Sequence, residues 1–222
     1  MNPSNSRLLL LAALICGAQI PTLRAQTSLA DAPPLGTSQT KPNIVFTLDN
    51  SGSMDAVHPT DDGDNNATRP CYTNVLYNPL YYDPNITYAP PKKFDGSSMP
   101  DSTYTAAWDN GYRANTPNAG TTFTVNLSNA FGNGGGYSDY QRVGAGGGGY
   151  YYAWTAGTTP IPKMLDCRAD GQYTRVDINN GTAAQKTNFA NWYSYYRKRL
   201  QAVKAAVGAA LVTYGSNIRV GF

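Results

Sequence analysis

The chain has 222 residues and a formal net charge of +3, from 17 Lys and Arg against 14 acidic residues. Removing residues 1–25 would take away two arginines and no acid, leaving 15 basic and 14 acidic residues. That balance is too even for a nucleic-acid-binding surface, so no nucleic acid is expected as a partner. All 14 acids are Asp, which excludes any catalytic pair of glutamates.

Residues 1–25 have the pattern of a secretory signal peptide. Arg7 supplies the positive charge, and residues 8–18 form an apolar run of 11 residues. A membrane span needs about 20 apolar residues, so we expect export, cleavage after Ala25 and no integral membrane span thereafter. A buried N-terminal helix is the alternative, which the proline and polar residues behind the run disfavour. Residues 26–41 then have the composition of a linker.

The apolar, β-branched residues 43–48 predict a strand buried on both faces of a parallel sheet. Residues 42–54 thus hold a strand and the loop behind it, in which Asp49, Ser51 and Ser53 alternate. Open α/β sheets place their ligand sites at the carboxyl ends of strands. One carboxylate and two hydroxyls suit Mg²⁺ with water completing its shell, and Ca²⁺ or Mn²⁺ are the alternative ions.

Catalytic interpretations of this loop lack the residues they require. A phosphatase of the haloacid-dehalogenase type needs a second Asp where Ser51 stands. A nucleophile elbow needs the pattern G-x-S-x-G, which neither serine has, and His58 is the only visible base. The remaining alternative is a turn in which Asp49 and the serines only cap backbone amides. We therefore expect a non-catalytic metal loop rather than an enzyme.

A second acidic cluster occupies residues 61–66. Aligned from Asp62 as an EF-hand loop, it has Ala67 at the glycine position and Thr73 at the glutamate position. The EF-hand interpretation fails on both counts, and a looser surface calcium site stays open as an alternative.

Residues 55–181 hold 13 of the 17 tyrosines and many Asn, Gly and Pro residues. This composition predicts a large irregular insertion rather than a domain with a large core, with a mobile Gly/Tyr-rich stretch over residues 132–152. Cys71 and Cys167 are the only cysteines left after export, and an oxidising compartment favours a disulfide between them. The alternative, a two-cysteine metal site, lacks further ligands.

Residues 182–222 return to a regular pattern. Apolar residues from Phe189 to Tyr214 recur in steps of three and four, which predicts one helix that ends at Gly215. Residues 218–222 predict a second strand, so strand, helix and strand imply a right-handed βαβ unit in an incomplete α/β fold. The basic residues between the apolar positions are expected on a solvated face, with a contact patch for acidic groups as the alternative. These basic residues are Arg197, Lys198, Arg199 and Lys204.

Three stretches resemble known families. Residues 41–54 (KPNIVFTLDNSGSM) resemble the first strand and metal-ion-dependent adhesion site of von Willebrand factor A domains. Residues 77–88 (YNPLYYDPNITY) and 188–197 (NFANWYSYYR), continuing through the helix into 218–222, resemble segments of PilY/PilC-type type IV pilus tip proteins. The resemblance covers most of residues 41–222. It implies an incomplete, Rossmann-like A-domain unit with a large Tyr/Gly-rich insertion between its metal loop and its helix.

The resemblance also implies a function. Such proteins are exported adhesins and pilus-biogenesis factors of the periplasm, outer membrane and cell surface. They stand at the pilus tip with minor pilins and attach to host or abiotic surfaces. Only Asp49, Ser51 and Ser53 carry over as metal residues, since the family's remaining Thr and Asp ligands and its β-propeller would lie beyond Phe222. A generic secreted A-domain protein that binds a matrix or cell-surface ligand is the alternative, disfavoured by the insertion.

Overall fold

The computed structural model describes residues 40–57, 70–93, 95–114, 123–131, 147–155 and 172–221. Contacts divide the chain into Met1–Thr40 and Lys41–Phe222, and the described helices and strands all belong to the second unit. The predicted signal peptide and nearly all of the predicted linker lie outside the described residues. None of the described helices is long and apolar enough to cross a membrane.

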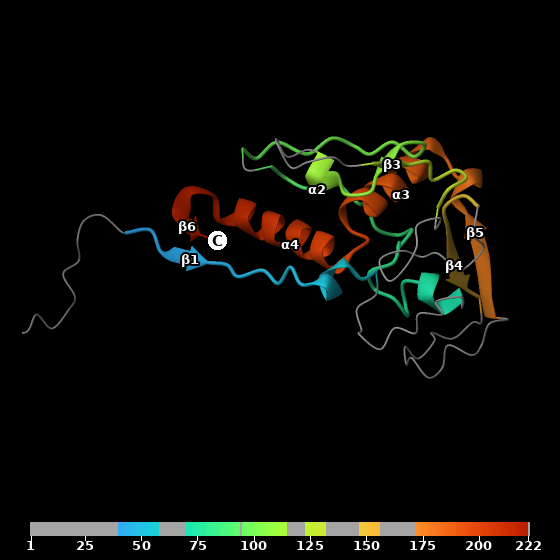
Figure 1. The fold of residues 1–222 in the computed structure, drawn as a ribbon, viewed down its shortest axis with the longest axis horizontal. Coiled ribbons are helices and arrows are strands. Elements are labelled where there is room, and N and C mark those ends of the chain that lie inside the picture. Colours follow the sequence, from blue (N-terminus) through green and yellow to red (C-terminus); the bar gives the residue numbers. More distant parts are fainter. Residues whose placement is uncertain are drawn as a thin grey trace, which may run out of the picture. The chain divides into compact units, whose positions relative to one another are not determined.

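The described part of the chain contains two longer helices, together with short strands and single helical turns (Figure 1). The strands are β1 (Asn43–Val45), β2 (Ala107–Trp108), β3 (Thr124–Val125), β4 (Tyr150–Trp154), β5 (Tyr173–Asp177) and β6 (Arg219–Gly221). The α-helices are α2 (Gly111–Ala114), α3 (Ala183–Tyr195) and α4 (Arg199–Tyr214). Turns of 3-10 helix are η1 (Gly52–Asp55), η2 (Pro70–Thr73), η5 (Ile178–Asn180) and η6 (Gly215–Asn217).

Strands β1 and β6 pair in parallel, with Ile44 opposite Val220, although they come from opposite ends of the described sequence (Figure 1). Helix α4 lies between them in the chain, so the predicted order of strand, helix and parallel strand is confirmed. The first strand is shorter than the predicted residues 43–48, although the Phe46 amide still donates to the Gly221 carbonyl at 3.0 Å.

The small sheet is poorly covered. Val45 is 75% exposed and Val220 is 38% exposed, so the strands are not buried on both faces as the sequence predicts. A groove of about 560 Å³ lies between the C-terminal half of α4, β6 and the turn at Lys92–Gly96. Within the described residues, therefore, the β1–α4–β6 unit lacks the apolar packing that such a sheet normally receives from neighbouring elements.

The single helix predicted from Phe189 to Tyr214 is in fact two helices. Thr182 begins α3 with a reciprocal capping box to Gln185, and α3 ends at Tyr195. The backbone is extended at Lys198, from which α4 starts again. Gly215 then ends α4 at a positive φ of 54°, a conformation that favours glycine, and this helix stop is confirmed.

At the break between α3 and α4, the side chain of Arg197 donates the hydrogen bond that a backbone amide would donate in a continuous helix. The amide of residue 197 would donate to the Tyr193 carbonyl if α3 continued. Instead, the guanidinium Nη1 of Arg197 donates to that carbonyl at 2.8 Å. One of the carbonyls left open at the C-terminal end of α3 is thus satisfied without another helical turn.

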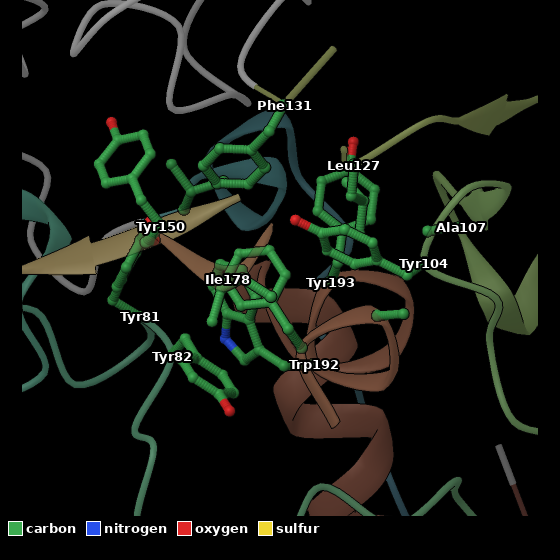
Figure 2. Close-up of a cluster of buried hydrophobic side chains, with 13 residues drawn as sticks. Tyr81, Tyr82, Tyr104, Ala107, Leu127, Phe131, Tyr150, Ile178, Trp192 and Tyr193 are labelled. Carbon is green, nitrogen blue, oxygen red and sulfur yellow. Dashed lines mark hydrogen bonds between the residues drawn. The ribbon is translucent and has the colours of Figure 1, made fainter. Parts of the chain in front are cut away.

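The insertion and α3 together form an aromatic core, shown in Figure 2. The described parts of residues 55–181 are irregular, as predicted, but many of their aromatic side chains are buried in a core that they share with α3. Aromatic rings bury about 150–250 Å² each, and here they meet mostly edge to face, as Tyr81 does with Trp192 at 5.0 Å between ring centroids. The buried cluster contains Val57, Tyr81, Tyr82, Tyr104, Ala107, Leu127, Phe131, Tyr150, Ile178, Phe189, Ala190, Trp192 and Tyr193.

Polar tips of the core residues hold the surrounding loops in place. Trp192 donates from its indole nitrogen to the Leu80 carbonyl at 2.9 Å, and the Tyr81 hydroxyl donates to the Tyr150 carbonyl at 2.5 Å. On α3, Asn188 accepts from the Tyr88 amide at 2.7 Å and Asn191 accepts from the Ser102 amide at 2.7 Å. These bonds satisfy loop backbone groups that no sheet or helix satisfies, which explains how so irregular a segment can be buried.

The end of the Gly-rich run has a packing role. A Cβ on Gly149 would lie 2.5 Å from the Phe189 ring, closer than any side chain allows. The Gly149 amide donates to the Leu127 carbonyl at 2.7 Å, and its carbonyl accepts from the Ile178 amide at 2.8 Å. Residues 147–152, part of the stretch predicted to be mobile, therefore form the lead into β4 (147–149) and its first three residues, whereas residues 132–146 lie outside the described residues.

Arg197 is the one cation that the described core encloses, with 1% of its side chain exposed. Its guanidinium forms a short ion pair with the Asp109 carboxylate and donates to the Asp109 carbonyl at 2.6 Å. The guanidinium also stacks over the Tyr193 ring at 3.9 Å from the centroid. The prediction of a solvated face is wrong for this residue, because burial places its charge against a carboxylate, two carbonyls and a ring.

Replacing Arg197 by Met should lower the free energy of unfolding by about 3–5 kcal/mol, because Asp109 would lose its partner in a mostly desolvated place. Urea unfolding followed by tryptophan fluorescence measures this loss. The matched control is Arg175→Met, which removes an exposed ion pair to Asp177 and should cost about 1 kcal/mol. Equal losses in the two variants would contradict the role assigned to Arg197.

The core should also be sensitive to alkaline pH. Burial raises the pKa of Tyr88 to about 12 and that of Tyr104 to about 12. A raised pKa means that the folded state favours the neutral phenol, so this stability is complete below the unfolded value of about 10. It is lost as the pH rises from there through about 12. Urea unfolding across this range, with tyrosinate absorbance, should show the loss. Tyr88→Phe should reduce it, and Tyr214→Phe, at a half-exposed position on α4, should not.

Candidate metal centre

Asp49 and Ser51 lie in the exposed loop between β1 and η1, and Ser53 lies in η1 and is also exposed. The Ser51 amide donates to Asp49 Oδ1 at 2.8 Å, which folds the loop back on its carboxylate. The Ser51 and Ser53 hydroxyl oxygens lie 3.0 Å apart. The structure thus brings the three predicted site residues together and places them beyond the carboxyl end of β1.

The carboxylate is held in its charged form. Hydrogen bonds from the Ser51 backbone and side chain lower the pKa of Asp49 below its ordinary value, because they favour the ionised oxygen atoms. The loop therefore carries a negative charge throughout the neutral range. Cation affinity at this loop should accordingly change little with pH between about pH 5 and pH 8.

The two serine hydroxyls hydrogen-bond to each other, and their spacing is also compatible with neighbouring ligands of an octahedral divalent ion. Neighbouring ligands around Mg²⁺, with bonds of about 2.0–2.1 Å, lie about 3 Å apart, which matches the spacing of the two hydroxyl oxygens. One carboxylate and two hydroxyls supply hard oxygen ligands, and water or residues from elsewhere would complete the shell. The described residues contain no cluster of three or more His, Cys, Asp or Glu side chains that could form a competing site.

The chain contains a second turn with which the alternative, a simple capping turn at Asp49, can be compared directly. Asp95 and Ser97 form the same kind of turn, in which the Ser97 amide donates to Asp95 Oδ1 at 2.9 Å. Asp95 is also exposed, and hydrogen bonds from Ser97 lower the pKa of its carboxyl as well. The Asp49 loop differs because its serine hydroxyl faces a second hydroxyl, that of Ser53, and not only the carboxylate.

Other residues singled out in the sequence fall elsewhere. His58 and the acidic cluster at 61–66 lie outside the described residues. Cys71 is fully buried beside Tyr72 and is disulfide-bonded. Cys167 also lies outside the described residues, so its pairing with Cys71 stays a prediction.

Sequence reasoning missed the residues that hold the far end of the loop. Lys198 was expected on a solvated face, yet its Nζ lies 2.7 Å from Asp55 Oδ1, and its side chain is 12% exposed. The Arg199 amide donates to the Ala56 carbonyl at 3.0 Å. A basic residue at the start of a helix carries no local signal for such a contact, because the partner is remote in sequence.

Comparison with known proteins gives clear relatives. The chain is 32% identical over 226 aligned positions to type IV pilus biogenesis factor PilY1 of Pseudomonas aeruginosa strain PAK, an alignment that covers 96% of this chain and 19% of the relative. PilY1 of strain PAO1 is 31% identical over 226 positions, covering 96% of this chain and 18% of the relative. The chain thus spans about a fifth of the length of these relatives. No family model and no solved structure matches it.

The similarity is not confined to the metal loop. Because the alignments cover 96% of the chain, they run through the loop, the aromatic core and both long helices. The tyrosine-rich residues 55–181 therefore belong to the part that this chain shares with the two pilus biogenesis factors.

Asp49→Ala should lower Mn²⁺ or Mg²⁺ affinity by more than about 100-fold, since loss of even an outer-shell partner costs about 10–100-fold. Ser53→Ala should weaken binding less, because it removes a neutral ligand. Calorimetric titration of the purified chain measures both. Asp95→Ala is the matched control, since it removes the same kind of turn without a third oxygen, and it should leave affinity unchanged. Equal affinities in the Asp49→Ala variant and the parent would reduce the loop to a capping turn.

Proposed function

We propose that this chain is part of an exported type IV pilus biogenesis factor that binds a divalent cation at Asp49, Ser51 and Ser53. Its role is to support pilus assembly and attachment to surfaces. The observation that carries the proposal is the combination of 32% identity to PilY1 over nearly the whole chain with three oxygen donors gathered in one exposed loop.

The proposed fold is the opening unit of a von Willebrand factor A domain with the aromatic core inserted into it. Three features support this assignment: the parallel pairing of β1 and β6, the position of α4 between them in the chain, and the metal loop directly behind β1. Open α/β sheets bind ligands at this edge. The exposed apolar residues Val45 and Val220 are consistent with a sheet that is larger in the longer relatives.

The cation would act as a bridge. A loop with one carboxylate and two neutral hydroxyls leaves a divalent ion electrophilic, so the ion can accept an acidic group from a partner. Mg²⁺ fits the donor spacing, with Ca²⁺ or Mn²⁺ as alternatives. We propose minor pilins at the pilus tip and a host or abiotic surface as the partners, and the periplasm, outer membrane and cell surface as the location.

A generic secreted A-domain protein, binding a matrix or cell-surface ligand, is the second candidate. It would share the metal loop but would not need the aromatic core. The core spans several loops and α3, and it lies within the region of similarity to the pilus biogenesis factors. This observation favours the pilus role.

In cells that assemble type IV pili through the full-length protein, Asp49→Ala should reduce both surface pili and attachment while export stays at the parental level. The physical reason is the loss of the loop's only charged ligand. Immunoblots of sheared pili, attachment counts and secreted protein levels provide the measurements, with Asp95→Ala as the control. Normal pili with reduced attachment would favour the generic binding protein. Parental pili and attachment would contradict the proposed function.

A further inference from the structure

The three residues directly behind the metal loop are each held by the core. Asp55 forms the ion pair with Lys198, and the Ala56 carbonyl accepts from the Arg199 amide at 3.0 Å. The Val57 carbonyl accepts from the Asn78 side chain at 3.0 Å. Ala56 and Val57 are buried, whereas Asp49 to Ser53 are exposed. The chain thus passes from an exposed to a buried position within three residues of Ser53.

The turn η1 connects Ser53 to this fixed position. The Ala56 amide donates to the Ser53 carbonyl at 3.2 Å, and the Met54 amide donates to the Ser51 carbonyl at 3.0 Å. Ser51 therefore precedes, and Ser53 lies within, a single 3-10 turn whose far end is Asp55. Such a turn is short and has poor hydrogen-bond geometry, so its order depends on what holds its ends.

The residues that hold η1 are themselves anchored. The turn contacts the start of α4, which Figure 1 shows where the cyan segment meets the helix. Gln201 caps the amide of Lys198 at 3.2 Å and donates to the Asp109 carbonyl at 3.2 Å. Asp109 also binds Arg197. A continuous set of contacts therefore runs from the aromatic core through Asp109 and the start of α4 to the end of η1.

We propose that Lys198 is a positioning residue for the cation loop, acting through Asp55 to fix the turn that carries Ser51 and Ser53. This inference rests on the proposed cation site. The ion pair is partly desolvated, because the Lys198 side chain is 12% exposed and that of Asp55 is 55% exposed. Fixing Asp55 orders the turn before the ion arrives, so less order has to be gained on binding. Cation binding should then stabilise the contact between η1 and the start of α4, and that contact should in turn strengthen cation binding.

The test is Mn²⁺ affinity, followed by electron paramagnetic resonance of the purified chain, combined with hydrogen exchange of residues 49–57 without metal. Lys198→Met keeps the apolar stem and removes the charge. It should lower Mn²⁺ affinity by about 10–100-fold, the range for residues that orient a ligand, and speed exchange in this segment. Lys198→Arg should restore both. Asp55→Asn, at the exposed partner, should reproduce the loss without disturbing the stem's packing.

Lys204→Met is the matched control, because Lys204 is on the same helix but lies over the Tyr112 ring. It should change neither Mn²⁺ affinity nor exchange at 49–57. Parental Mn²⁺ affinity in both Lys198→Met and Asp55→Asn would overturn the positioning role and leave the cation site intact. Absence of Mn²⁺ binding in the parent would overturn the proposed cation site itself, and with it the role of Lys198 in binding.

Discussion

Arg197 carries a charge that is almost wholly enclosed, and a buried charge is tolerated only when it is paired and hydrogen-bonded. Its partner, Asp109, comes from the strand end of β2, far away in sequence. The same guanidinium satisfies the carbonyl of Tyr193, near the end of α3. Arg197 therefore joins the end of α3 to the loop behind β2, directly before α4 begins. The position of α4, and through it the grip on the metal loop, depends on this pair.

The aromatic core supplies hydrogen-bond partners to backbone groups of residues 55–181 that no helix or sheet satisfies. The insertion has few aliphatic runs, and much of its backbone is in neither helix nor sheet, so its polar groups must be satisfied by side chains. Tyrosine and tryptophan suit this task because each supplies a large apolar surface and a hydrogen-bonding tip. Trp192 and Tyr81 do both, and the asparagines of α3 satisfy further loop groups. Helix α3 thus contributes Phe189, Ala190, Trp192 and Tyr193 to the same core as residues 55–181.

The candidate metal loop has the opposite character. It is exposed, its bonds are local, and its charge comes from Asp49 alone. An exposed loop with three donors can leave coordination positions for water or for a partner's acidic group, which suits a binding role. The loop does not lie on a free chain end, however, because Asp55, Ala56 and Val57 are held by the start of α4 and by the core. The exposed oxygen atoms of the loop and the residues that anchor it are therefore only one 3-10 turn apart.

The sequence by itself determined the features that depend on near neighbours. These include the loop of Asp49, Ser51 and Ser53 and the helix stop at Gly215. Spacing and local backbone preference are enough for each of them. Only the tertiary structure decided the division into α3 and α4, the aromatic core, and the roles of Arg197 and Lys198. Their partners, Asp109 and Asp55, are remote in sequence, and the helical period stays regular across the break. A periodic pattern shows which residues share a helix face. It does not show which basic residue on the helix will be buried against an Asp that is remote in sequence.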